Sequence, residues 1–177
     1  MNEDRVWIQT YTGKQFFLDE ITAEQIDIKD IAHALSLICR YTGHCAEFYS
    51  VAQHSILVSQ QLPDELKLDG LMHDAAEAYI GDISTPLKSL LPEYRKLEGK
   101  IFMAIADKFK LRLPEPHDVI LFDRCLCATE VKKLMKKQVK PWAIDINKMY
   151  IKDLDIIPYS SWTAEFIFLN LFDELKR

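Results

Sequence analysis

Apolar side chains recur every three or four residues along most of this chain, a spacing that places them on one face of an α-helix. Ile28, Ile31 and Leu35 begin the first such series, which predicts a helix over about residues 28–39. The same spacing predicts further helices over about residues 50–62, 64–80, 97–109, 119–137 and 161–176. We therefore expect an all-α fold in which each helix buries one apolar stripe.

The N-terminal segment has a different pattern. Two strand-like stretches flank Thr12-Gly13 and predict a small β-hairpin over residues 6–18. Capping boxes at Thr22–Gln25 and Ser50–Gln53 precede the first two predicted helices. Residues 138–160 are polar and aromatic, and their pattern predicts neither a helix nor a strand.

The length of 177 residues fits one domain. At roughly 150 residues a folded chain buries about 70% of its unfolded surface and has no need to split. Apolar residues make up 49% of the sequence, and no repeat or linker interrupts it. We therefore expect residues 1–177 to form a single domain, with its core at about residues 28–137.

Charge and hydropathy exclude several classes of partner. The net charge is −5, so the chain carries no basic footprint for duplex nucleic acid or anionic lipid. The longest apolar run, Ile101–Ala106, is far short of the about 20 residues that span a bilayer. The N-terminus, Met-Asn-Glu-Asp, lacks the regions of a signal peptide, and we expect a cytoplasmic protein without a membrane partner. In a reducing compartment the cysteines are expected to be small buried thiols rather than disulfides.

Several ionisable residues fall on helix faces that should be apolar. At 100° per residue, His54 shares the face of Val51, and His73 and Glu77 share one stripe of the following helix. Asp123 lies in the apolar row of the helix at 119–137. An unpaired buried carboxylate is very costly, so such a group must be neutralised, find a partner or bind a metal.

A single inward histidine is more simply a hydrogen-bonded core residue, and Asp123 alone is as well explained by a salt bridge. With Asp74, the neighbour of His73, the set becomes two imidazoles and two carboxylates, which are the donors that a divalent transition ion prefers. We therefore predict one such ion per chain (Co, Mn or Zn, with Mg as an additional option), bound by His54, His73, Asp74 and Asp123.

The order of these residues resembles the H…HD…D signature of the HD-domain metal-dependent phosphohydrolases. A bare HD dipeptide is weak, but the surrounding segments are more specific and are similar to those of bacterial 5′-deoxynucleotidases and phage-type deoxynucleotide hydrolases: Ser50–Ser55, His73–Glu77 and Gly81–Lys88. The resemblance covers about residues 28–137 and implies a single HD-domain helical bundle.

The resemblance also implies roles for two further acids. Glu77 matches the catalytic glutamate of these enzymes, and Asp82 matches a second acid near the leaving group. A carboxylate at Glu77 can take or orient the proton of an attacking water, and an acid at Asp82 can protonate the leaving oxygen. The simpler alternatives are a surface ion pair for Glu77 and a turn cap for Asp82.

Four residues are candidates for contact with substrate. Arg40 resembles the arginine that contacts phosphate in the 5′-deoxynucleotidases, and Tyr41 stands where those enzymes carry a tryptophan. Lys88 can offset phosphate charge, and His44 lies beside Arg40 in the same break between helices. The simpler alternative for both Arg40 and Lys88 is a solvated cation.

These features favour an enzyme that hydrolyses phosphate from a 2′-deoxynucleoside 5′-monophosphate. A deoxynucleoside triphosphate triphosphohydrolase uses the same metal core and stays an alternative, with Arg95 and Lys96 as additional cations. A cyclic-nucleotide or alarmone hydrolase is less favoured. An inactive HD module that binds a nucleotide or a protein is the alternative from another class. We also expect a homo-oligomer, because Phe166, Phe168 and Phe172 are predicted to be exposed on the last helix.

Overall fold

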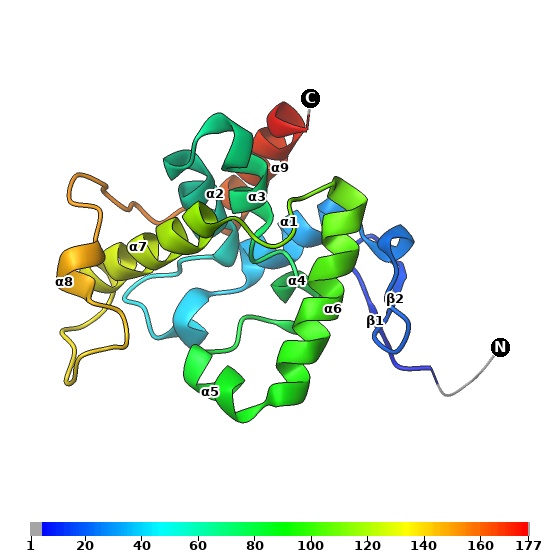
Figure 1. Cartoon of the computed structure of the whole chain (residues 1–177), viewed down its shortest axis with the longest axis horizontal. Helices are drawn as coiled ribbons and strands as arrows, with labels where there is room; N and C mark the ends of the chain where they lie inside the picture. Colours follow the sequence, from blue (N-terminus) through cyan, green and yellow to red (C-terminus); the bar gives the residue numbers. More distant parts are fainter. Residues whose placement is uncertain (1–4, 177) are drawn as a thin grey trace.

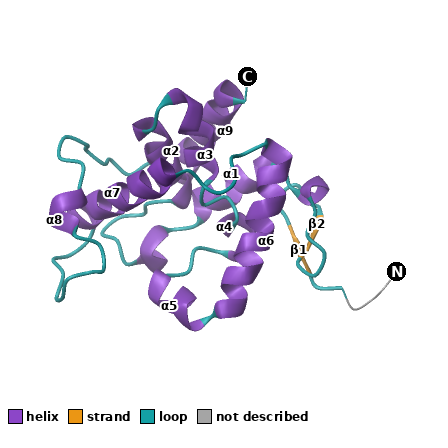
Figure 2. Ribbon diagram, viewed as in Figure 1, coloured by secondary structure: helices purple, strands orange, loops and turns teal. Residues whose placement is uncertain are grey.

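The computed structural model describes residues 5–176, and the N-terminal residues on which the signal-peptide expectation depends lie outside this range. The described chain is predominantly helical and carries a small antiparallel hairpin, as Figures 1 and 2 show. Strand β1 (Trp7–Gln9) pairs with β2 (Gln15–Phe17), with Trp7 opposite Phe17. The helical class and the hairpin are therefore confirmed.

The helices follow the hairpin in the order η1 (Ala23–Gln25), α1 (Ile28–Leu37), η2 (Arg40–Gly43), α2 (Val51–Gln61), η3 (Asp64–Leu66), α3 (Lys67–Met72), α4 (Glu77–Ile80), α5 (Thr85–Leu90), α6 (Pro92–Phe109), α7 (His117–Leu134), α8 (Ile146–Met149) and α9 (Ser161–Leu175). The predicted helices correspond to α1, α2, α6, α7 and α9, although α7 ends three residues earlier than predicted. Among the described helices, none combines the length and the apolar character that crossing a membrane requires.

The predicted helix over residues 64–80 is wrong, because the chain forms short pieces there. Between α3 and α4 the backbone bonds span three residues: Ala75 N donates to Met72 O, and Glu77 N donates to Asp74 O, both at 3.0 Å. Such 3₁₀-type bonds wind the chain more tightly than an α-helix. Residues 73–76 therefore depart from the 100° spacing on which the sequence argument relied.

Helix caps also differ from expectation. Thr22 makes no capping hydrogen bond, and α1 is capped by Asp27, whose side chain accepts from Lys29 N. Ser50 caps α2 as predicted, but Gln53 does not complete the capping box. Its buried amide instead bonds the backbone of the segment before α9, donating to Ile157 O and accepting from Tyr159 N, each at 2.8 Å.

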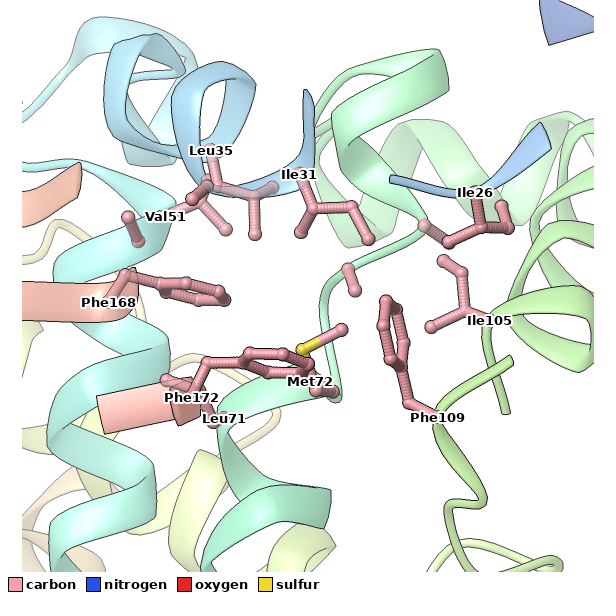
Figure 3. Packing of buried hydrophobic residues seen from close by; sticks show 14 of the residues in the cluster. Ile26, Ile31, Leu35, Val51, Leu71, Met72, Ile105, Phe109, Phe168 and Phe172 are labelled. Atoms are coloured by element: carbon pink, nitrogen blue, oxygen red, sulfur yellow. The ribbon is translucent and has the colours of Figure 1, made fainter. Parts of the chain in front are cut away.

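The last helix lies at the centre of the main core. Ala164, Phe168 and Phe172 recur every four residues on α9 and are at most 2% exposed. They pack against α1, α2 and α3, and Figure 3 shows both phenylalanines pointing into the core. The prediction that Phe168 and Phe172 are exposed is therefore wrong; Phe166, at 56% exposure, is the one of the three that lies outside, stacked on Trp162.

Helices α2 and α3 cross closely at Gly70. A Cβ atom at Gly70 would collide with Leu62 Cδ1 and lie 3.3 Å from Ser59 Cα. Ser59 Oγ also donates to Lys67 O at 2.7 Å, which joins the two helices at this crossing. The crossing places His54 of α2 opposite the turn that follows α3.

Gly70→Ala is therefore expected to destabilise the fold by about 1–3 kcal/mol, because the added methyl group overpacks a buried crossing. Urea denaturation measures this effect. Gly99→Ala is the matched control, since a Cβ on this α6 glycine meets no atom within 4 Å. That control should be neutral or stabilising by about 0.5–1 kcal/mol. Equal stabilities of the two variants would contradict the packing argument.

Candidate metal centre

Two histidines and an aspartate from three separate segments come together, with His54 fully buried and the side chain of Asp123 37% exposed. His54 lies on α2, His73 in the turn after α3 and Asp123 on α7, and one ligand atom of each lies within 4.8 Å of the others. His54 Nε2 is 3.3 Å from His73 Nε2 and 3.2 Å from Asp123 Oδ1. His73 Nε2 is 3.9 Å from the same oxygen. This group can hold a metal ion.

Asp74, the fourth residue of the predicted set, lies beside both histidines. Its Oδ2 atom is 3.2 Å from His73 Nε2 and 3.6 Å from His54 Nε2. The same oxygen is 3.5 Å from Nη1 of Arg40. The four residues therefore lie together, with a guanidinium at the edge of the group.

Hydrogen bonds at Nδ1 leave Nε2 as the nitrogen that faces this group in both histidines. His73 Nδ1 is 2.8 Å from the carbonyl oxygen of Gly70, which can only accept, and His54 Nδ1 is 2.7 Å from Oε1 of Glu130. A neutral imidazole that donates from Nδ1 presents a lone pair at Nε2. If both imidazoles are neutral, two such lone pairs face each other at 3.3 Å, and either a proton or a metal cation between them would remove their repulsion.

The spacing of the donors also fits a divalent ion. Ligands about 2.0–2.2 Å from an ion in tetrahedral or octahedral geometry lie roughly 2.8–3.6 Å from one another. Most of the distances between Nε2 and carboxylate oxygens in this group fall in that range. The donor types and their spacing are thus compatible with a bound divalent ion, whose identity remains a prediction.

The charges of these residues shift the pKa values of their neighbours. Burial disfavours the charged imidazole of His73, but the carboxylate of Asp74 outweighs this effect and raises the His73 pKa to about 10. Burial likewise opposes ionisation of the two aspartates, but His73 lowers the pKa of Asp74 and His54 lowers that of Asp123. Both carboxylates are therefore held in the charged form that binds cations.

Glu77 lies beside the group and is buried. Its Oε1 atom accepts from Nζ of Lys88 at 2.9 Å, whereas no described residue donates to the buried Oε2 atom. Burial raises the pKa of Glu77 well above its usual value, and the negative charges of Asp74 and Asp82 add to this shift. Lys88 also donates to Glu98 at 2.7 Å, so its ammonium bridges two carboxylates.

A cavity of about 350 Å³ opens beside these residues. The residues that line it are His73, Asp74, Ala76, Glu77, Lys88, Arg95, Glu98, Gly99, Phe102, Glu115, Ile120 and Asp123. Five of them are carboxylates and two, Lys88 and Arg95, are cations. Within the described chain Arg95 makes no ion pair of 4 Å or less, whereas Lys88 makes two.

The other residues proposed to contact substrate lie outside the lining of this cavity. Arg40 bonds Oε2 of Glu130 through Nε at 3.1 Å, and the hydroxyl of Tyr41 donates to the same oxygen at 2.5 Å. Asp82 is half-buried, and burial raises its pKa, an effect that nearby Arg40 opposes. His44 is exposed. The structure therefore groups Glu77 and Lys88 with the metal-ligand candidates and groups Arg40 and Tyr41 around Glu130.

Sequence reasoning missed three acids at this site, Glu98, Glu115 and Glu130. Glu130 is fully buried. Burial opposes its ionisation, but Arg40 and His54 lower the pKa of Glu130 to about 2. A signal for it exists, because Glu130 follows Asp123 by seven residues and so lies within about 20° of it on an α-helix. Glu115 carries no comparable signal, because it lies in the loop before α7, where no helical periodicity applies.

Comparison with known proteins found two relatives. The chain is 40% identical to the uncharacterized protein YfdR of Escherichia coli K12 over 171 residues, which cover 97% of this chain and 96% of that protein. It is 33% identical over 124 residues to the uncharacterized protein RCAP_rcc00048 of Rhodobacter capsulatus, covering 63% of each. No family model matches the chain.

Proposed function

The chain belongs to the family that includes YfdR of Escherichia coli, and we propose that it is a metal-dependent phosphohydrolase of the HD-domain type, which removes the 5′-phosphate of a 2′-deoxynucleoside monophosphate. One observation carries the proposal. The Nε2 atoms of His54 and His73 converge with Asp74 and Asp123 beside a buried carboxylate oxygen of Glu77 that receives no hydrogen bond from the described residues.

A divalent ion bound at this group would supply a water of lowered pKa and a positive charge for a phosphate oxygen. Glu77 is placed to take the proton of the attacking water at Oε2, while the bond from Lys88 to Oε1 fixes the orientation of the carboxylate. Burial raises the pKa of Glu77 and so increases the proton affinity that a general base requires.

Asp82 and Arg40 would act on the other side of the phosphate. The water oxygen forms a bond to phosphorus as the bond from phosphorus to the 5′-oxygen breaks, and the leaving oxygen needs a proton. A half-buried acid whose pKa is raised can hold that proton, which is the role we assign to Asp82. Arg40 would offset negative charge on the phosphate from its position 3.5 Å from Asp74.

The charge of the cavity favours a monophosphate over a triphosphate. Five carboxylates and two cations line it, so with every carboxylate ionised, His73 neutral and a divalent ion bound the lining would carry a net charge of about −1. Lys88 is already engaged by Glu77 and Glu98, which leaves Arg95 as the lining cation without a carboxylate partner in the described chain. A triphosphate would bring about four negative charges to this surface and would need more free cations than these.

The test is a panel of nucleoside and deoxynucleoside mono- and triphosphates, assayed with Co²⁺, Mn²⁺, Zn²⁺ or Mg²⁺ and followed by product analysis. Release of inorganic phosphate from a deoxynucleoside monophosphate supports the proposal. Release of triphosphate from a deoxynucleoside triphosphate would replace it with the triphosphohydrolase alternative. Nucleotide binding without turnover under any metal would instead identify an inactive binding module.

Among substrates that are turned over, we expect a preference for the 2′-deoxy form. An aromatic residue near C2′, which the resemblance assigns to Tyr41, leaves a 2′-hydroxyl crowded and unpaired. Such a group costs about 1–3 kcal/mol, or roughly 5- to 150-fold in kcat/KM. Kinetics on matched ribo- and deoxyribonucleotides measure the ratio, and equal kcat/KM values would contradict the preference. Because the Tyr41 hydroxyl bonds Glu130, Tyr41→Phe tests whether the ring itself discriminates.

A further inference from the structure

We propose that Glu130 is a positioning residue that holds the metal ligand His54 and the Arg40–Tyr41 loop through one carboxylate. This inference depends on the metal centre and not on the reaction proposed above. Its tests therefore measure metal binding and local order, and they keep their meaning even if the protein hydrolyses no nucleotide.

The carboxylate of Glu130 is 0% exposed and receives four hydrogen bonds. Oε1 accepts from His54 Nδ1 at 2.7 Å and from the Tyr49 hydroxyl at 2.8 Å. Oε2 accepts from the Tyr41 hydroxyl at 2.5 Å and from Arg40 Nε at 3.1 Å. An ionised carboxylate is an acceptor with about four lone-pair positions, so every position has a donor.

The first half of this arrangement fixes His54. Because Oε1 can only accept, the imidazole must carry its hydrogen on Nδ1, and Nε2 is left to face His73 and Asp123. Both residues of the pair are fully buried, so no water competes for the bond. A partner of this kind sets the tautomer and the ring orientation of a metal-binding histidine and raises its basicity.

The second half fixes a strained loop. Tyr41 and Thr42 have φ values of 57° and 54°, a left-handed conformation that is costly for residues other than glycine. The loop is joined to the chain by the bond from Arg40 N to Tyr49 O at 2.9 Å, and its side chains are joined to Oε2 of Glu130. The same contacts hold the Arg40 guanidinium next to Asp74.

Replacing Glu130 by glutamine distinguishes the contacts of Oε1 from those of Oε2. Its amide offers one oxygen that accepts and one NH₂ group that donates, so it can accept from the N–H group of only one side, although the NH₂ group can still donate to the tyrosine hydroxyl of the other. With the oxygen toward His54, the NH₂ group faces Nε of Arg40, which cannot accept a hydrogen bond. Glu130→Gln should therefore keep most of the metal affinity and release the loop, whereas Glu130→Ala should lose both contacts.

Titration calorimetry with Zn²⁺ and with Mn²⁺ tests the ligand side. Glu130→Ala is expected to weaken metal binding about 10- to 100-fold, and Glu130→Gln less than about 10-fold. Asp30→Asn is the matched control, because Asp30 is a buried carboxylate of α1 that accepts from Thr12 of the hairpin. A folded Glu130→Ala variant with the metal affinity of the wild type would overturn the proposal.

Hydrogen exchange tests the loop side, with at least 10-fold faster exchange expected for the amides of residues 41–44 in Glu130→Gln and not in Asp30→Asn. Unchanged exchange would overturn the coupling of loop and ligand. A third test uses only the wild-type protein and therefore does not depend on whether the Glu130 variants fold. In ¹⁵N spectra of the Zn²⁺-loaded protein, His54 should carry a proton on Nδ1, and coordination through Nδ1 would overturn the proposal.

Discussion

Asp74→Ala and Asp123→Ala are each expected to lose the bound metal, and turnover should fall by roughly 10³-fold, because a divalent ion supplies several kcal/mol of transition-state stabilisation. Each aspartate places an oxygen within 3.2 Å of a histidine Nε2, so each change removes a charged donor from the group. The two imidazoles and single carboxylate that remain form at most a three-ligand site of lower affinity, from which we expect the ion to be lost during purification. Elemental analysis of the purified variants, together with kinetics under added metal, measures both effects.

Asp118→Ala is the matched control for this prediction. Asp118 lies on α7, five residues before Asp123, and its side chain is 55% exposed. It should retain the metal and full turnover. Wild-type metal content in Asp74→Ala, with activity intact, would remove Asp74 from the ligand set and leave the group of His54, His73 and Asp123 as the candidate site.

Glu77→Ala is expected to keep the metal and the fold and to lower kcat by on the order of 10²-fold or more, as for the loss of a general base. The ligand group is complete without Glu77, and the Oε2 atom of Glu77 is placed to receive a proton. Proton transfer belongs to the transition state, so the loss should appear in kcat more than in KM. Metal content and steady-state kinetics must be measured on the same preparation.

Two further variants make this prediction specific. Glu77→Gln keeps the bond from Lys88 at its oxygen but cannot take a proton, so it should be as inactive as Glu77→Ala. Glu93→Gln changes an exposed glutamate at the start of α6 and should behave as the wild type. A metal-free Glu77→Ala protein would make Glu77 a ligand, and a fully active one would make it a structural partner of Lys88.

The inward positions of His54 and Asp123 could be predicted from the sequence because α2 and α7 are regular helices, whereas His73 lies in the turn after α3, where the predicted helix is wrong. When the residues of a regular helix are placed 100° apart around its axis, a polar residue within the apolar stripe can be recognised. Glu130 lies on the stripe of Asp123 and is predictable by the same reasoning. Its partners are not, because Arg40 and Tyr41 reach it from a loop whose left-handed φ values no periodicity encodes.

The errors have a common physical origin. Aromatic and aliphatic residues lie on more than one face of α9, so the sequence does not show which of them are buried, yet the face of Ala164, Phe168 and Phe172 packs against three other helices. The break between α3 and α4 could not be predicted from the sequence. A segment with a few 3₁₀-type bonds can have the same amino-acid composition as a continuous α-helix. In both cases tertiary packing, and not local pattern, decides the structure.

The position of α9 has a consequence for how the core assembles. Helix α9 fills the centre of a core whose other walls, α1, α2 and α3, come from the first half of the chain. The backbone of residues 157–159 also satisfies the buried amide of Gln53, the neighbour of His54. A chain in which α9 has not yet docked therefore has every candidate ligand residue but lacks the packing that aligns His54. We expect the candidate metal group to form only once α9 is in place.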